Sequence, residues 1–228
     1  MKTLATLLAA ACLLVAAPAA HADSVTLGGV RVELRPGTSQ VVTVDHTRGV
    51  RATVSLWRLT DAGWKRGLTT RDGRTGYGGL VDGDRRRQGS GTTPLGTYGL
   101  TSTFGTHGTD PRAALPHHRI RRGDFWVQDN RSPYYNRLRN QRDGGFRWWL
   151  PSSDANSSER LTDFPRPYEW SIVTDFNVEQ VRHRGSGIFL HVNGRGATAG
   201  CVSAPRRVIR KLVTVLDPAR VPVIGIGR

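Results

Sequence analysis

Apolar residues in this chain recur mostly at the short spacing of β-strands. Residues 41–44 and 50–56 are rich in valine and leucine and flank the polar segment 45–49, which predicts a hairpin with its turn there. Further apolar runs at residues 97–103, 124–128, 169–176 and 221–226 predict more strands. The clearest strand is predicted at residues 186–192, where Gly187-Ile188-Phe189-Leu190 leads directly into His191.

Helical spacing is found near the C-terminus. Val208, Leu212 and Val215 recur at intervals of three or four residues, and Asp217-Pro218 ends the run. Ser203 is the predicted N-cap of this helix, and Pro205 is tolerated in a first turn. The chain is therefore predicted to be mainly β, with one helix that follows Cys201.

Two stretches between the predicted strands look irregular. The glycine-rich segment 73–91 carries the run Arg85-Arg86-Arg87 and is predicted to be loop with short strands. The polar segment 130–167 contains Trp148 and Trp149, and a loop of that length is usually functional or disordered.

The N-terminus has the pattern of a secretory signal peptide. Lys2 is followed by a mostly apolar stretch over residues 4–20, and Ala20-His21-Ala22 is a small-residue cleavage site. We expect cleavage after Ala22 and export of the mature chain. The remaining residues suit one domain, divided here into a lead-in at 23–38 and a catalytic domain at 39–228. No later segment is apolar enough to cross a bilayer.

Positive charge dominates the composition. Of 33 basic residues all but Lys2, Lys65 and Lys211 are arginine, and loss of Lys2 with the signal lowers the formal charge from +15 to +14. Such an excess outside a cell indicates attraction to a polyanion, and anionic cell-wall polymers are the expected partner. A basic surface that is merely solvated explains the charge equally well. Nucleic acid is not expected, because no known binding motif organises the arginines.

A single cysteine remains after the predicted cleavage. Cys201 therefore has no intramolecular disulfide partner, although exported proteins usually keep their cysteines paired. Unpaired thiols are often small buried hydrophobes. Here the neighbours favour chemistry: His191 ends a predicted strand, and the glycine-rich stretch 193–200 can fold back to bring the imidazole to the thiol. A helix start close to Cys201 would lower the thiol pKa, and the Gly200 and Cys201 N–H groups would hold an oxyanion. These features predict acyl transfer through a thioester.

The same residues resemble the YkuD-like L,D-transpeptidase catalytic domain. That family has a histidine on a strand and then Ser/Thr-His-Gly-Cys, and here Phe189-Leu190-His191 precedes Thr198-Ala199-Gly200-Cys201-Val202. Upstream, the family's Thr-Pro-x-Gly-x-aromatic segment is similar to residues 93–98, and Tyr134-Tyr135-Asn136 resembles another recurrent element. The likeness runs from about residue 39 to 226 and implies a β-sandwich or barrel. Ala199 and Ser203 depart from the family pattern, and the histidine-to-cysteine spacing is shorter than usual.

The resemblance implies a reaction and a set of site residues. The Cys201 thiolate would attack a peptidoglycan stem tetrapeptide at its third, diamino acid residue and release D-alanine, with His191 as the base and the Val192 carbonyl orienting it. An amine of a second stem would complete the cross-link, whereas water would make the enzyme an L,D-carboxypeptidase. No cofactor or metal ion is expected. Substrate contacts are expected from Thr198, Asn193, Ser203, Tyr135 and Arg195.

Other classes of protein fit less well. Penicillin-binding serine enzymes need Ser-x-x-Lys, and Ala62 and Val208 stand three residues before Lys65 and Lys211. His107 with Asp110, or the pair His117-His118, gives no complete zinc ligand set. A papain-like cysteine motif is also missing. The remaining alternative is a basic wall-binding domain that keeps the fold without activity, with Trp148 and Trp149 as surface aromatics.

Overall fold

Strands make up most of the regular structure in the computed structural model, which describes residues 23–228. In chain order they are β1 (Ser24–Leu27), β2 (Val30–Glu33), β3 (Gln40–Arg48), β4 (Arg51–Thr60), β5 (Gly63–Arg74), β6 (Leu80–Asp82), β7 (Thr93–Gly105), β8 (His117–Arg119), β9 (Asp124–Trp126), β10 (Leu138–Asn140), β11 (Glu159–Arg160), β12 (Ser171–Thr174), β13 (Phe189–Val192), β14 (Val202–Ala204) and β15 (Val223–Gly227). Helix α1 spans Arg206–Val215, and short 3₁₀ helices lie at Gln141–Asp143, Leu161–Asp163, Pro167–Glu169 and Pro218–Arg220. The predicted signal peptide, residues 1–22, lies outside the described residues.

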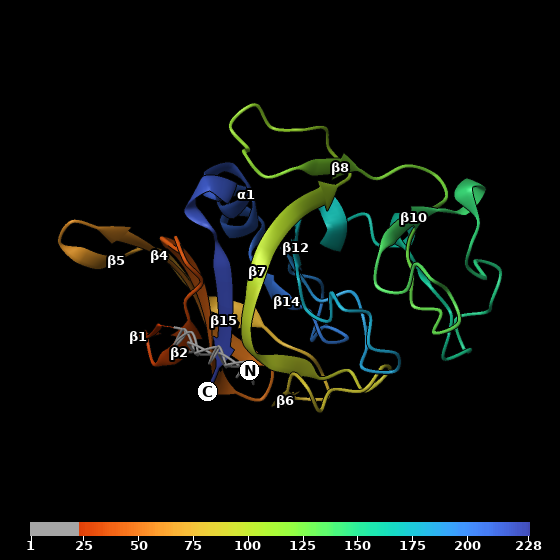
Figure 1. Ribbon diagram of the computed structural model, residues 1–228, viewed down its shortest axis with the longest axis horizontal. Helices are drawn as coiled ribbons and strands as arrows, with labels where there is room; N and C mark the ends of the chain where they lie inside the picture. Colours follow the sequence, from red (N-terminus) through yellow and green to blue (C-terminus); the bar gives the residue numbers. More distant parts are fainter. Residues whose placement is uncertain (1–22) are drawn as a thin grey trace, which may run out of the picture.

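A ten-stranded mixed sheet organises the molecule. Its order is β12-β13-β14-β5-β4-β3-β15-β7-β6, with β8 also paired to β7. Because β12 pairs with β7 as well as with β13, the sheet closes on itself around a shared core. Figure 1 shows the long, curved β7 beside β15, with β3 and β4 beyond it. The prediction of a mainly β barrel or sandwich is confirmed.

The core is built from alternate residues of neighbouring strands. Val42 lies opposite Leu56 on β4 and beside Ile224 on β15, and Val44 repeats the pattern two residues later. Since side chains two apart on a strand share a face, this row forms one apolar surface. Val208, Ile209, Leu212 and Val213 of α1 belong to the same buried cluster. Each such side chain contributes about 1.5–3 kcal/mol relative to an exposed one.

The helix forms as predicted, but its start differs. Pro205 is the N-cap and gives no side-chain cap, while Ser203 lies in β14 and donates from Oγ to Asn193 Oδ1 at 2.7 Å. The prediction of Ser203 as the cap was wrong because β14 pairs in parallel with β13, which takes residues 202–204 into the sheet. Cys201 is therefore separated from α1 by a strand.

Other boundaries were also displaced. β3 continues to Arg48 and β4 starts at Arg51, so the predicted turn at 45–49 is mostly paired strand with a bulge after His46. Backbone pairing continues there although the side chains are polar. The predicted lead-in at 23–38 holds the hairpin β1–β2, whose Val30 and Val32 pack on Val223.

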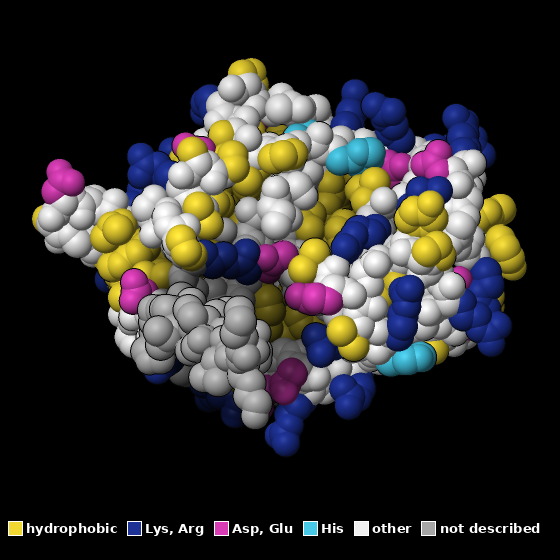
Figure 2. Space-filling model, in the orientation of Figure 1, with side chains coloured by type: hydrophobic (Ala, Val, Ile, Leu, Met, Phe, Trp, Pro, Cys, Tyr) yellow, Lys and Arg dark blue, Asp and Glu magenta, His cyan; other side chains and the backbone are white. Residues whose placement is uncertain are grey.

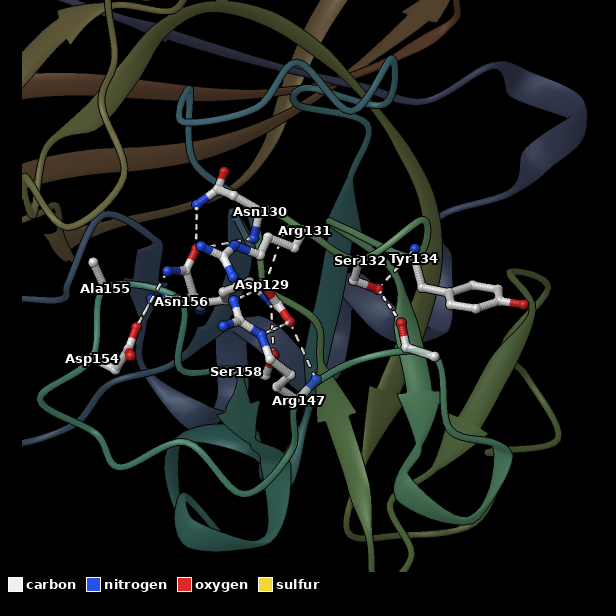
Figure 3. A network of polar contacts seen from close by, with 12 residues as sticks. Asp129, Asn130, Arg131, Ser132, Tyr134, Arg147, Asp154, Ala155, Asn156 and Ser158 are labelled. Atoms are coloured by element: carbon white, nitrogen blue, oxygen red, sulfur yellow. Dashed lines mark hydrogen bonds and ion pairs between the residues drawn. The ribbon is translucent and has the colours of Figure 1, made fainter.

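The long polar segment 130–167 is an ordered structure with short strands and 3₁₀ turns. The Asp129 carboxylate accepts hydrogen bonds from Arg147 Nε at 2.9 Å and from the Arg131 N–H at 3.0 Å. Ser132 Oγ donates to the Gly145 carbonyl at 2.6 Å, which ties the two ends of a subloop (Figure 3). Polar side chains thus hold this segment together with the buried side chains of Tyr135, Phe146 and Leu161.

Basic side chains are distributed over the surface. Figure 2 shows Lys and Arg around much of the visible face, with no single continuous stripe. Among residues 23–228 no helix has the length and hydropathy needed to span a membrane. The same residues contain no group of three or more His, Cys, Asp or Glu side chains arranged to hold a metal ion.

Candidate active site

Cys201 and His191 line one cavity of about 310 Å³. The lining also contains charged and polar groups from distant parts of the chain: Tyr77, Arg86, Gln88, Glu159, Tyr168 and Thr198. Backbone at Gly187, Gly194 and Gly196 completes part of the wall. The predicted pair of a thiol and an imidazole is therefore brought into a common cavity.

Sheet pairing explains how residues ten apart meet. β13 and β14 are parallel neighbours with Leu190 opposite Val202, so Cys201 stands at the level of Phe189. Phe189 donates its N–H to Cys201 Sγ at 3.4 Å, and His191 lies two residues further on the same face of β13. The register of two strands thus sets the relation between nucleophile and imidazole.

Thr198 holds the turn that precedes the thiol. Its N–H donates to the Thr75 carbonyl at 3.1 Å, and its carbonyl accepts from Tyr77 N–H at 2.9 Å. Its Oγ1 donates to the Cys201 carbonyl at 2.5 Å. Because Thr198 also lines the cavity, it supports the turn and remains a candidate substrate contact.

The His191 imidazole is neutral and oriented. Nδ1 lies 2.8 Å from the Val192 carbonyl oxygen, and since a carbonyl only accepts, Nδ1 carries the proton. Nε2 is left with the lone pair that a base requires. Burial lowers the pKa of His191 to about 4, and the Tyr168 ring packs edge-on against the imidazole with centroids 5.5 Å apart. Val192 makes the contact that the family resemblance implied.

The resting thiol is protonated. Burial raises the pKa of Cys201 to about 12, and the nearby Glu159 carboxylate raises it further, against smaller effects of the Phe189 N–H and Arg86. Sγ donates to the Gly187 carbonyl at 3.2 Å. The predicted lowering of this pKa by a helix start was wrong, because β14 stands between Cys201 and α1.

Glu159 and Tyr168 were not found from the sequence. Burial raises the pKa of Glu159 to about 7, and its carboxylate accepts a short hydrogen bond from the Tyr168 hydroxyl. Both line the cavity with the thiol. No local motif marks Glu159, because only pairing of β11 with β9 carries it to this place.

Arg86 was also missed as a site residue. It lies in the predicted arginine run, yet only 4% of its surface is exposed and it lines the cavity. Burial lowers its pKa, partly offset by the nearby Cys201. Nothing in the run Arg85-Arg86-Arg87 distinguishes the buried member from its exposed neighbours.

Gly200 differs from its predicted role. Its φ of +130° is accessible mainly to glycine, and an added Cβ would lie 2.8 Å from the Thr92 carbonyl oxygen. The glycine is thus required by backbone geometry and close approach. Its N–H donates to Thr198 Oγ1 at 3.2 Å, so this expected oxyanion donor already has a partner in the structure.

Four of the predicted substrate contacts do not line the cavity. Tyr135 is fully buried and donates from its hydroxyl to Gln88 Oε1 at 2.7 Å, which positions a lining residue rather than substrate. Ser203 is also fully buried against Asn193, whose amide donates to the Asp72 carbonyl at 2.9 Å. Arg195 is exposed on the loop before Thr198. Asn193, Ser203 and Arg195 were predicted from their closeness to the motif and Tyr135 from the family resemblance, and among the five predicted residues the cavity lining includes Thr198 alone.

The family model for the YkuD L,D-transpeptidase catalytic domain matches residues 40–224. This chain belongs to that family. The resemblance inferred from the histidine and cysteine motifs is thereby confirmed, and the catalytic function of the family applies to this domain. A search of curated proteins found no similar sequence.

A solved structure, that of Bd1075 from Bdellovibrio bacteriovorus, is similar to this chain at 16% identity with a TM-score of 0.41. The match covers 83% of this chain and 48% of that one. The chain therefore spans about half the length of that protein.

Proposed function

We propose that this protein is a peptidoglycan L,D-transpeptidase that cross-links stem peptides through a thioester on Cys201. The single observation that carries the proposal is the shared cavity of Cys201 and His191, with the imidazole Nδ1–H bound by the Val192 carbonyl. Membership of the family supplies the reaction class.

Acylation starts from a neutral pair. His191 Nε2 takes the thiol proton as Cys201 Sγ attacks the carbonyl of the third residue of the donor stem. The tetrahedral intermediate then breaks its C–N bond, the imidazolium protonates the leaving amine, and D-alanine departs. Because the thiol is protonated at rest, we infer that proton transfer accompanies attack.

Deacylation reverses these roles. The side-chain amine of a second stem attacks the thioester carbonyl, His191 takes a proton from that amine, and the C–S bond breaks to return the thiol. The new amide is the cross-link. If water attacks in place of the amine, the product is a tripeptide and the enzyme is an L,D-carboxypeptidase.

The test uses a covalent probe and a natural donor. We expect the purified protein to gain one carbapenem adduct by mass spectrometry and to release D-alanine from a stem tetrapeptide. Cys201→Ala should abolish both, while Ser157→Ala, a change in the polar segment outside the cavity, should abolish neither. A wild-type protein with no adduct and no D-alanine release would overturn the proposal.

A non-catalytic wall-binding domain is the second candidate. Ala199 at the position of the family's second histidine favours it, and so does the exposed pair Trp148 and Trp149, whose rings lie 5.8 Å apart away from the cavity. This candidate predicts retention on purified cell walls without any D-alanine release, and Cys201→Ala would leave that retention unchanged.

We further propose that the protein is exported and attracted to anionic wall polymers. The signal-like residues 1–22 and the formal charge of +14 that remains after their removal support this. N-terminal sequencing of the exported protein should begin at Asp23. Retention on walls should fall with added salt, and again after chemical removal of the anionic polymers.

A further inference from the structure

Arg86 is a buried cation in the wall of the catalytic cavity. Its exposed fraction is 4%, whereas Arg85 and Arg87 on either side are exposed. Nε donates to the Thr92 carbonyl at 2.8 Å and Nη1 to the Arg184 carbonyl at 3.3 Å. Within residues 23–228 the remaining nitrogen, Nη2, has no hydrogen-bond acceptor. Two of the three nitrogens thus hold the group in place and leave the third for a ligand.

No carboxylate of the described chain forms an ion pair with Arg86. The guanidinium packs over the Phe176 ring, 5.5 Å from its centroid. This cation–π contact compensates only weakly for the burial of the charge. An arginine stays charged in proteins, and burial of a charge without a counter-ion is unfavourable. The structure therefore keeps a positive charge where an anion would be bound strongly.

The free end of Arg86 lies next to the catalytic cysteine. Nη2 would be 2.7 Å from a Cβ built on Gly200, the residue before Cys201. Nη1 would be 1.6 Å from a Cβ built on Gly185. These two glycines make the room that the guanidinium occupies, so the cation is part of the turn that presents the thiol.

The other ionisable lining groups do not cancel this charge at neutral pH. His191 is uncharged, because burial lowers its pKa to about 4. Glu159 is partly protonated, because burial raises its pKa to about 7. The cavity is consequently suited to an anionic group close to the scissile bond.

The donor of the proposed reaction carries such a group. D-alanine is its last residue, so its free carboxylate carbon lies roughly 3.5 Å along the chain from the carbonyl carbon that Cys201 attacks. We propose that Arg86 Nη2 binds this terminal carboxylate and makes the enzyme select donors that end one residue beyond the scissile bond. This inference rests on the proposed function and names the donor group that the site reads.

Two synthetic donors test it: a tetrapeptide stem ending in D-alanine, and the same peptide ending in D-alaninamide. Loss of a charge-assisted hydrogen bond should lower kcat/KM of the wild type for the amide by about 10- to 100-fold. Arg86→Gln should bring the acid-to-amide ratio close to one, and Arg86→Lys should keep an intermediate ratio. The matched control Arg87→Gln, in the exposed neighbour, should keep the wild-type ratio.

Each outcome has a defined meaning. Equal rates on both donors with the wild type would overturn the role of Arg86 and leave the proposed function standing. Equal losses on both donors in Arg86→Gln would assign Arg86 to loop structure alone and overturn the inference too. Release of D-alanine from neither donor would remove the proposed function and this inference with it. If Arg86→Gln does not fold, judged by its melting temperature, the wild-type ratio together with Arg86→Lys decides.

Discussion

The His191 side chain donates from Nδ1 to the carbonyl of Val192, the next residue on the same strand, at 2.8 Å. A backbone carbonyl thus fixes the tautomer of the base without any acidic residue. Because the carbonyl belongs to β13, the orientation of the imidazole depends on the same strand that places it beside Cys201. Among the described residues, Glu159 is the one acidic residue that lines the cavity.

The first prediction concerns the base. His191→Ala should leave the fold intact and lower the rate of carbapenem acylation by about 10²- to 10³-fold, because general base catalysis contributes on that order. Single-turnover mass spectrometry measures the rate. His46→Ala, in the β3–β4 bulge, is the matched control and should acylate normally. Unchanged kinetics in His191→Ala would mean that another group takes the thiol proton.

The second prediction concerns the pH dependence of the free thiol. The pKa of Cys201 is raised to about 12 and that of His191 is lowered to about 4, so both groups are uncharged between those values. Alkylation by iodoacetamide should therefore keep rising with pH through the range 7 to 10. A plateau reached below pH 8 would instead reveal a preformed thiolate and imidazolium pair.

The third prediction concerns the contribution of Glu159 to stability at different pH values, tested with Glu159→Gln. Burial raises the pKa of Glu159 to about 7, so the folded state holds its proton more tightly than the unfolded state. Stability from this group is present below its unfolded pKa and is lost as pH rises through about 7. Between pH 4 and pH 8 the free energy of unfolding of the wild type should fall by up to about 3 kcal/mol relative to that of Glu159→Gln.

Urea unfolding of both proteins at the two pH values measures this difference. The exposed Glu179→Gln is the control and should follow the wild type. The same Glu159→Gln change should move the alkylation profile of Cys201 to lower pH, since the Glu159 charge helps to raise the thiol pKa. Parallel stability curves for wild type and Glu159→Gln would contradict a raised pKa.

The fourth prediction concerns the polar segment 130–167. Hydrogen bonding by the Arg147 side chain lowers the pKa of Asp129. The Asp129–Arg147 pair therefore stabilises the folded state at pH values above the unfolded pKa of Asp129, and this stabilisation is lost as the pH falls. Asp129→Asn should lower the free energy of unfolding at pH 7 by about 1–2 kcal/mol, because it removes the charge-assisted hydrogen bonds that the buried Asp129 carboxylate accepts.

Thermal unfolding at pH 7 and pH 3 tests the fourth prediction. The difference between wild type and Asp129→Asn should be smaller at pH 3, because the unfolded carboxyl takes up a proton there while the lowered pKa makes the folded carboxyl resist it. Asp61→Asn, in the exposed turn between β4 and β5, serves as the control. A difference of equal size at both pH values would assign the effect to shape rather than to charge.

Local sequence patterns predicted the presence of strands and the helix better than their first and last residues. The spacing of Val208 and Leu212 predicted α1, and the apolar run ending at His191 predicted β13. The limits moved because they depend on backbone partners: Ser203 joined a strand when β14 paired with β13, and residues 45–48 stayed in β3 because β4 continued beside them. A single segment carries no record of the segment that will lie beside it.

The site divides in the same way. His191, Gly200 and Cys201 are close in sequence and belong to one motif, so they could be predicted together. Arg86 and Glu159 come from segments far from that motif, and pairing of β11 with β9 brings Glu159 to the cavity. Tyr135 does not line the cavity, because loops that meet only in the folded chain bury it and bind its hydroxyl to Gln88.

By itself, the sequence determined a mainly β domain of the L,D-transpeptidase family, with a lone cysteine and its histidine in one short motif, because periodicity and motif spacing are local properties. The tertiary structure alone decided the state of those groups. Burial makes the thiol a weak acid and the imidazole a weak base. Pairing of β11 with β9 and the loop between β6 and β7 place one carboxyl and one buried arginine beside them. Solvation and proximity are properties of the folded chain, which is why the charges around Cys201 could not be read from the residues next to it.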